Sequence, residues 1–186
     1  MRILLAALAG AVAMFVWTAI AHMATPLGAM GFQQMPNEAP VLAQMQTSIG
    51  DKGGFYNFPW VDPSDPQMMQ KYAEKEKNGP SGLLLYRGAG HGMGESMTPM
   101  LIKEFAKQFA ESLIFAWIVS MIAFGFSTRV TAVTAMGVAT AMATNVSYWN
   151  WYGFPLDYTL AQMIIEIVAA LVSGLAIAAV LRNRTA

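Results

Sequence analysis

Long apolar stretches occur in two parts of the chain, one at the N-terminus and three near the C-terminus. The first runs from Ile3 to Ala21, nineteen residues without a charge, and the others cover 109–126, 130–149 and 158–181. A helix of about 20 apolar residues crosses the hydrocarbon core of a bilayer, which is about 30 Å thick. The pattern therefore predicts four transmembrane helices, the first of them within residues 1–22.

Short links connect the last three apolar stretches, at 127–129 and 150–157. Short connections make neighbouring helices antiparallel. We therefore expect an all-α membrane protein, with a four-helix transmembrane bundle built from the first helix and residues 104–181. Residues 182–186 form the predicted cytoplasmic tail.

The first apolar stretch has a competing interpretation as a signal peptide. Arg2 would then be its charged beginning, and Ala19-Ile20-Ala21 resembles a cleavage site. The stretch is longer than the usual apolar region of a signal peptide, which is about 7–15 residues. This length favours a transmembrane helix.

Residues 23–103 differ in composition from the rest of the chain. They hold eight of the nine prolines and most of the glycines and acidic residues, and they contain no long apolar run. This pattern predicts a water-facing segment. Two short helices are expected after Asn37 and Pro66, and two short strands at 55–58 and 83–87. A two-stranded hairpin is marginal alone, so we expect a small mixed α/β cap that packs on the helices or on a partner.

Charge is distributed unevenly between the two predicted sides of the membrane. The side that holds both termini collects four arginines and no acidic residue: Arg2, Arg129, Arg182 and Arg184. Basic residues in short loops mark the cytoplasmic face. We therefore expect a multi-pass protein of the bacterial inner (cytoplasmic) membrane, with both termini cytoplasmic and residues 23–103 extracytoplasmic.

Composition excludes several classes of protein. Charged residues make up only 12% of the chain and apolar residues 55%, which is typical neither of soluble domains nor of disordered chains. The 11 basic and 11 acidic residues balance in charge. The chain has no run of basic residues that would indicate nucleic-acid binding. The absence of cysteine excludes disulfides, iron–sulfur clusters and thiol nucleophiles.

The expected partners are the lipid bilayer and a protein partner or a second copy of the chain.

One carboxylate lies deep in a predicted transmembrane helix. Glu166 is about 13 Å below the outer end of the last stretch, at 1.5 Å per residue. Gln162 is one turn above it, and Asn145 can reach either side chain. His22 ends the first helix at the outer level, and Glu111 begins the second at about the same level. We expect these five residues to form a polar layer, with no Lys or Arg at the depth of Glu166. Glu166 is then either a proton-relay acid or a hydrogen-bonded packing residue.

A glycine-rich stretch before the second transmembrane helix offers soft metal ligands: His91, Met93, Met97 and Met100. Imidazole and thioether groups suit Cu(I), and glycine allows the backbone to approach an ion closely. His22 is also followed directly by Met23. Methionine is equally common as a flexible core filler, so a copper site and a structural loop are both open.

Aromatic side chains cluster at the outer end of the third apolar stretch: Tyr148, Trp149, Trp151 and Tyr152. Amphipathic aromatic side chains collect at the headgroup level of a bilayer. We therefore predict that these residues are interfacial anchors, with ligand stacking as the alternative.

The N-terminal part of the chain contains a recognisable series of residues. It comprises Trp17, His22-Met23, Pro26-Leu27-Gly28 and Pro36-Asn37-Glu38. This series resembles the N-termini of a small family of uncharacterised bacterial four-span membrane proteins. The resemblance implies a fixed entry into the outer segment, but it implies no activity and no functional residue. Beyond this region only the layout of apolar stretches is similar.

The sequence contains no set of residues typical of nucleophilic catalysis, which makes an enzyme the less favoured class. The leading hypothesis is an accessory or scaffolding subunit of a bacterial inner-membrane assembly. Two alternatives stay open: a periplasm-facing copper-binding protein that uses His91 and its methionines, and a proton-coupled transporter or membrane enzyme centred on Glu166.

Overall fold

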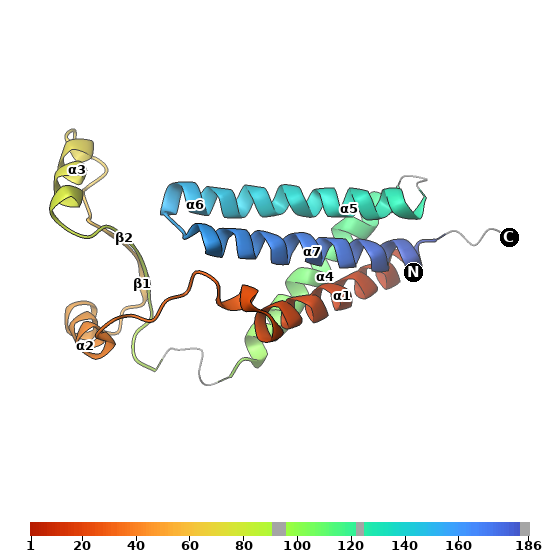
Figure 1. The fold of residues 1–186 in the computed structure, drawn as a ribbon, viewed down its shortest axis with the longest axis horizontal. Helices are drawn as coiled ribbons and strands as arrows, with labels where there is room; N and C mark the ends of the chain where they lie inside the picture. Colours follow the sequence, from red (N-terminus) through yellow and green to blue (C-terminus); the bar gives the residue numbers. More distant parts are fainter. Residues whose placement is uncertain (91–95, 122–124, 183–186) are drawn as a thin grey trace. The chain divides into compact units, whose positions relative to one another are not determined.

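The chain folds into two compact units, and most of its residues are helical. A computed structural model describes residues 1–90, 96–121 and 125–182. The first unit contains residues 1–32 and 97–186, and the second contains residues 33–96. The long helices of the first unit are α1 (Arg2–Ala24), α4 (Thr98–Ser120), α5 (Phe126–Ala141) and α7 (Leu156–Val180) (Figure 1).

Helix α5 continues beyond Ala141 without a break in direction (Figure 1). It passes through a π-helical turn, η2 (Met142–Val146), into α6 (Ser147–Tyr152). Gly153 follows with a φ of 69°, a left-handed conformation that ends helices and favours glycine. The next helix, α7, then runs back along α5.

Three helices among the described residues are long and apolar enough to cross a membrane: α1, the continuous helix 126–152, and α7. These three helices are compatible with an integral membrane protein. The expected span over 109–126 is not confirmed, because α4 ends at Ser120 and carries four charged residues: Lys103, Glu104, Lys107 and Glu111. Part of that predicted span, 122–124, lies outside the described residues.

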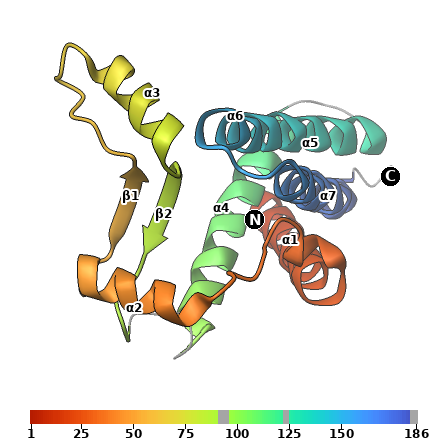
Figure 2. The same ribbon diagram turned by 60° about the vertical axis from the view of Figure 1, so that its left-hand side comes forward.

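Helices α1 and α7 form the centre of the first unit. Helix α7 packs against α1 and α5, and α1 also packs against α4, whereas α4 and α5 make few contacts with each other. Helix α4 crosses the others obliquely (Figures 1 and 2). The spatial order of the helices is therefore α4, α1, α7, α5.

Small residues bring these helices close together. Gly10 of α1 lies where a Cβ atom would meet the hydroxyl groups of Ser112 on α4 and Ser173 on α7. The backbone of Gly137 on α5 lies against Ala170 on α7 in the same way. Glycine and alanine allow such approach in membrane proteins, where packing rather than hydrophobicity holds helices together.

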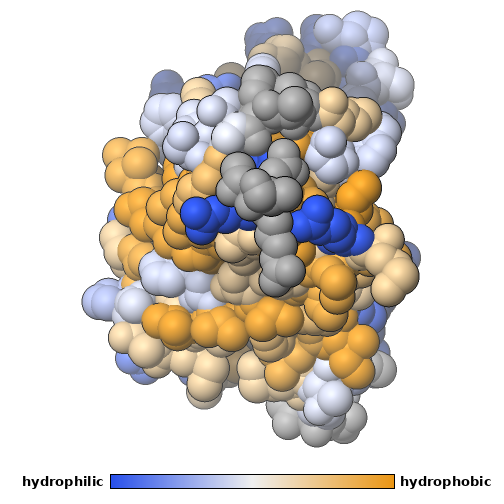
Figure 3. All heavy atoms as spheres, turned by 90° about the vertical axis from the view of Figure 1, so that its right-hand side faces the viewer, coloured by the Kyte–Doolittle hydropathy of each residue, from blue (hydrophilic) through white to orange (hydrophobic). Residues whose placement is uncertain are grey.

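Both termini of the described chain lie at the same end of the first unit. We name this end the terminal end, and we name the opposite end the loop end. At the terminal end the Nη2 atom of Arg2 donates to the carbonyl oxygen of Arg182 at 3.2 Å. Figure 3 views this end and shows strongly hydrophilic atoms near its middle with apolar atoms around them. Helices α1 and α7 are therefore antiparallel neighbours.

Arg129 is a buried charge at the terminal end. Its side chain is only 6% exposed, and its Nη1 atom donates to the carbonyl oxygen of Leu181 at 2.6 Å. The last carbonyl groups of a helix have no partner within the helix and carry partial negative charge. Arg129 therefore caps the C-terminus of α7 and joins it to α5.

Replacing Arg129 with leucine is expected to destabilise the purified protein by about 1.5–3 kcal/mol, the typical contribution of a hydrogen bond to a charged group. The leucine fills the space but leaves the Leu181 carbonyl group unpaired. Thermal unfolding in detergent micelles measures the effect. Arg2→Leu is the matched control, because Arg2 is exposed and its bond is longer. Equal losses for both variants would contradict a capping role.

A short 3-10 turn, η1 (Pro26–Ala29), follows α1. Its first amide is capped, since the backbone N–H of Leu27 donates to Thr25 Oγ1 at 3.2 Å. Gly28 lies against the backbone of His22. The Pro26-Leu27-Gly28 segment therefore folds back on the end of α1.

The second unit contains the predicted small sheet. Its elements are α2 (Glu38–Ile49), β1 (Gly54–Phe58), α3 (Met68–Asn78) and β2 (Gly82–Tyr86). The strands are antiparallel, with Gly54 opposite Tyr86 and Phe58 opposite Gly82. The hydroxyl group of Tyr86 donates to the carbonyl oxygen of Gly50 at 2.9 Å and ties the sheet to α2. None of the buried apolar side chains found among the described residues lies in this unit.

Candidate functional site

Two adjoining cavities in the first unit contain most of the polar residues predicted from the sequence. One has a volume of about 250 Å³ and is lined by residues of α1, α4, α5 and α7. The other, of about 510 Å³, extends from it toward the loop end between α1, α4 and α7. Both are lined by Lys107, Ile165 and Glu166, and we name them together the polar cleft. Its charged and amide-bearing residues include Glu104, Lys107, Gln108, Glu111, Gln162 and Glu166.

Glu166 is paired with Asn145 across α7 and the π-helical turn η2. The Nδ2 atom of Asn145 donates to Glu166 Oε2 at 3.0 Å and to the carbonyl oxygen of Ala141 at 3.0 Å. The Asn145 side chain is 5% exposed, so its orientation is fixed by its surroundings. Single π-helical turns inside α-helices are frequent at functional sites. The structure thus brings together two residues that the sequence placed within reach of each other.

A lysine lies beside Glu166, contrary to the sequence-based expectation. Lys107 lines both cavities together with Glu166, and its Nζ atom is 3.1 Å from Glu104 Oε1 and 4.0 Å from Glu111 Oε2. The expectation failed because the predicted apolar stretch begins at residue 109, so that Lys107 precedes it. Helix α4 packs mainly along α1, and from there its Lys107 lines the same cavities as Glu166 of α7. The spacing of Glu104, Lys107 and Glu111 along one helix face was the available signal.

Gln108 was not identified from the sequence, although it is the most buried polar side chain of the cleft. It is 1% exposed. Its Nε2 atom donates to Glu104 Oε1 at 2.9 Å and to Thr18 Oγ1 at 3.1 Å. Its Oε1 atom is buried and has no hydrogen-bond partner. Buried polar atoms without partners are rare in folded proteins and call for an explanation.

His22 and Gln162 line the loop-end part of the cleft. Near them, Trp17 Nε1 donates to the carbonyl oxygen of Ile165 at 2.9 Å and fixes α1 against α7. Of the five residues predicted to form a polar layer, His22, Gln162, Glu111 and Glu166 line the cleft and Asn145 bonds to Glu166. The predicted layer is instead extended along the helices: Glu111 lines the cavity of about 250 Å³, and His22 lines the cavity of about 510 Å³ toward the loop end.

The copper candidates are only partly within the described residues. His91 and Met93 lie outside them. Met97 and Met100 line the loop-end cavity together with His22 and Met23. No three His, Asp or Glu side chains in the described part of the chain are grouped as a metal site would require. Copper binding by His91, Met93, Met97 and Met100 therefore stays a hypothesis.

No protein-family model matches the chain, and no curated protein or solved structure matches it. The resemblance of the N-terminal residues to a bacterial membrane family therefore stays a prediction. Interpretation of the polar cleft rests on its own chemistry.

The predicted aromatic anchors are exposed in the structure. Tyr148, Trp149, Trp151 and Tyr152 lie on α6, and Trp151 is 78% exposed. The ring of Tyr148 stacks on Phe154, with 5.4 Å between ring centroids. Exposed aromatic side chains at the end of an apolar helix fit a headgroup-level position, and this role remains a prediction.

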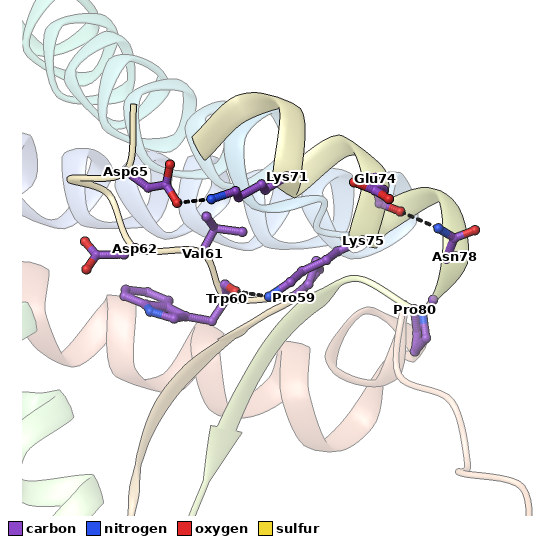
Figure 4. A pocket seen from close by; sticks show the side chains of 11 residues that line it. Pro59, Trp60, Val61, Asp62, Asp65, Lys71, Glu74, Lys75, Asn78 and Pro80 are labelled. Atoms are coloured by element: carbon purple, nitrogen blue, oxygen red, sulfur yellow. Dashed lines mark hydrogen bonds and ion pairs between the residues drawn. The ribbon is translucent and has the colours of Figure 1, made fainter. Parts of the chain in front are cut away.

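The second unit has an open pocket of about 710 Å³ between α3 and residues 59–65 (Figure 4). Lys71 Nζ lies 2.6 Å from Asp65 Oδ2, and Lys75 Nζ donates to the carbonyl oxygen of Trp60 at 2.8 Å. The Lys71 bond and the backbone N–H of Gln67 lower the pKa of Asp65. Bonds from the backbone and hydroxyl of Ser64 lower the pKa of Asp62.

These pairings connect α3 to the preceding segment, and in Figure 4 the two lysines point toward their partners within the pocket. Both lysines are solvent-exposed and are engaged in these local bonds. The polar cleft is the better candidate for a functional site.

Proposed function

We propose that this membrane protein binds and releases a proton at Glu166 and couples this exchange to the movement of a second solute through the polar cleft. The observation that carries the proposal is the pairing of Glu166 with Asn145 at a π-helical turn, within a cleft that also contains Lys107 and Glu111. Ionisable residues inside membrane helices are expensive to bury and are functional by default.

The surroundings of Glu166 allow both of its protonation states. A hydrogen bond from Asn145 stabilises the ionised form, whereas apolar neighbours such as Ile165 and Ala169 stabilise the neutral form. The charges of Lys107 and Glu111 also act on Glu166 across the cleft. A solute that changes the charge in the cleft would therefore change the proton occupancy of Glu166, which is the basis of coupling.

The proposal includes a topology. Helix α4 completes the predicted four-span bundle, and the terminal end, with Arg2, Arg129 and Arg182, faces the cytoplasm of a bacterium. Residues 23–103 then lie on the extracytoplasmic side. The cleft would accordingly receive protons and solute from outside the cell.

Purified protein in sealed vesicles with an entrapped pH-sensitive dye tests this function. Gradients of one solute class at a time are imposed: alkali cations, primary amines, carboxylates and neutral sugars. At least one class is expected to change the internal pH in protein-containing vesicles and not in protein-free vesicles. An unchanged internal pH with every class would contradict the proposal.

A second candidate is the accessory or scaffolding subunit, which is favoured by one feature of the second unit. Phe55 and Leu85 are cross-strand partners on β1 and β2 and are 64% and 68% exposed. Exposed apolar patches mark interaction sites. Native mass spectrometry of the protein taken from its own membranes in mild detergent is expected to show one reproducible additional subunit, which Leu85→Ser releases. A chain without such a subunit would contradict this role.

A further inference from the structure

The terminal end of the first unit brings three arginine residues together. The Nη2 atom of Arg2, at the start of α1, donates to the carbonyl oxygen of Arg182 at 3.2 Å. The Nη1 atom of Arg129, in the first turn of α5, donates to the carbonyl oxygen of Leu181 at 2.6 Å. Because Leu181 and Arg182 are adjacent in the chain, all three cationic residues are neighbours at the end of α7.

No acidic residue compensates these cations. Residues 1–37, 112–156 and 167–186 contain no Asp or Glu. Along α7 the nearest carboxylate is that of Glu166, which precedes Leu181 by about 22 Å at 1.5 Å per residue. Exposed charges interact over only about 8–10 Å at physiological ionic strength. Within the described part of the chain, the ion pairs involve none of the three arginines, so a counter-ion must come from another molecule.

The burial of Arg129 makes its charge costly unless a negative group lies nearby. Arg129 is only 6% exposed, and the carbonyl group of Leu181 to which it donates carries only a partial negative charge. A buried charge without a partner ion destabilises a folded protein. An anion held at the surface by Arg2 and Arg182, which are both exposed, compensates this charge through its electric field and does not need to contact Arg129.

An exposed apolar surface lies directly beside these cations. Leu4, Leu5 and Leu8 follow Arg2 on α1 within about two turns, and they are 55%, 56% and 46% exposed. Figure 3 shows apolar atoms around the strongly hydrophilic atoms of this end. An inorganic anion would use only the guanidinium groups, whereas a phospholipid presents a charged phosphodiester with acyl chains next to it. The combined surface therefore fits a phospholipid.

We infer that the terminal end binds an anionic phospholipid, whose phosphodiester accepts hydrogen bonds from Arg2 and Arg182 and whose acyl chains lie along the exposed leucines of α1. A guanidinium group has five N–H donors, and arginine pairs with phosphate through two of them at once. A zwitterionic lipid carries its own cation beside the phosphate and compensates less of the charge. The inference is independent of the proposed function, since neither arginine lines the polar cleft.

Native mass spectrometry of the purified, delipidated full-length protein in an uncharged detergent tests the inference. The probes are phosphatidylglycerol, phosphatidylcholine and sodium phosphate, each added separately at the same concentration. Phosphatidylglycerol is expected to bind saturably, with one lipid per chain, and to be retained at collision energies that remove phosphatidylcholine. Equal retention of the two lipids would overturn the inference. Binding of inorganic phosphate as strong as that of phosphatidylglycerol would overturn it as well, since the site would then recognise a free anion.

Two variants locate the binding site. Arg2→Gln and Arg182→Gln are each expected to weaken the binding of phosphatidylglycerol about fivefold, and about 25-fold together, which corresponds to the contribution of one basic residue each near an anionic lipid surface. Arg87→Gln is the matched control, because it removes the same charge from an exposed position of the second unit. Unchanged affinity in the double variant, or an equal loss in Arg87→Gln, would overturn the inference.

Thermal unfolding in mixed micelles provides a second measurement in solution. A ligand that binds only the folded protein raises the midpoint of unfolding as its concentration increases. An increasing fraction of phosphatidylglycerol is therefore expected to raise the midpoint of the unchanged protein and of Arg87→Gln, but not that of the double variant. Because Arg2 and Arg182 are exposed, the double variant is expected to fold. An equal rise in all three proteins would overturn the inference.

Discussion

The variant Glu166→Gln is expected to lose the solute-dependent pH change in vesicles, with a rate equal to that of protein-free vesicles. Glutamine keeps the shape of the side chain, and its amide oxygen can still accept the bond from Asn145 that is 3.0 Å long in the structure. It cannot exchange a proton. The fold should therefore persist while coupling is abolished.

Asp157→Asn provides the matched control for this experiment. Asp157 is a carboxylate of the same helix, but it is exposed at the beginning of α7 and accepts only a local bond from the backbone N–H of Tyr158. Its replacement should leave the pH change intact. Retained activity in Glu166→Gln, or equal loss in both variants, would exclude Glu166 as the proton-exchanging group. Circular dichroism and gel filtration of each variant check the fold.

The second large effect is expected at the closest contact between α5 and α7. In Gly137→Ala, the new methyl group would overlap the Cβ atom of Ala170, which is 1% exposed. A Cβ atom cannot rotate away, so the two helices must move apart. Overpacking of this kind costs about 1–3 kcal/mol, which a shift in thermal unfolding in detergent measures.

An exchange of the two residues tests the mechanism of this loss. Ala170→Gly alone should cost about 1 kcal/mol through the lower helix propensity of glycine. The double variant Gly137→Ala with Ala170→Gly moves the methyl group to the opposite helix and should recover most of the loss. Simple additivity would contradict direct contact, because distant sites add and touching sites do not. Gly125→Ala is the control, since no atom lies within 4 Å of the position of its Cβ.

The apolar helices could be predicted from the sequence because their determinants are local. In a bilayer each backbone polar group must find its partner within its own helix, so length and hydropathy decide where α1, the helix 126–152 and α7 lie. The two strands of the second unit were predicted for a similar reason, as glycine and proline mark their ends. The charged part of α4 was the exception. Because its charges lower the local hydropathy, the sequence did not indicate that this part of the helix lines a cleft.

The polar cleft was only partly predictable. The depth of Glu166 and the proximity of Asn145 follow from helical rise and the short link between their helices. The positions of Lys107 and Gln108 depend on how α4 crosses α1 and α7, which no residue of α4 determines alone.

The sequence by itself determined the membrane character, the apolar helices, the hairpin and the presence of one deep carboxylate. Only the tertiary structure decided which faces meet. Contacts at Gly10 and Gly137 set how closely the helices approach, and the oblique crossing of α4 (Figure 1) brings Lys107 and Gln108 to the cleft that Glu166 also lines. Helical periodicity shows which residues share a face, whereas the partner of that face depends on packing between helices distant in the sequence.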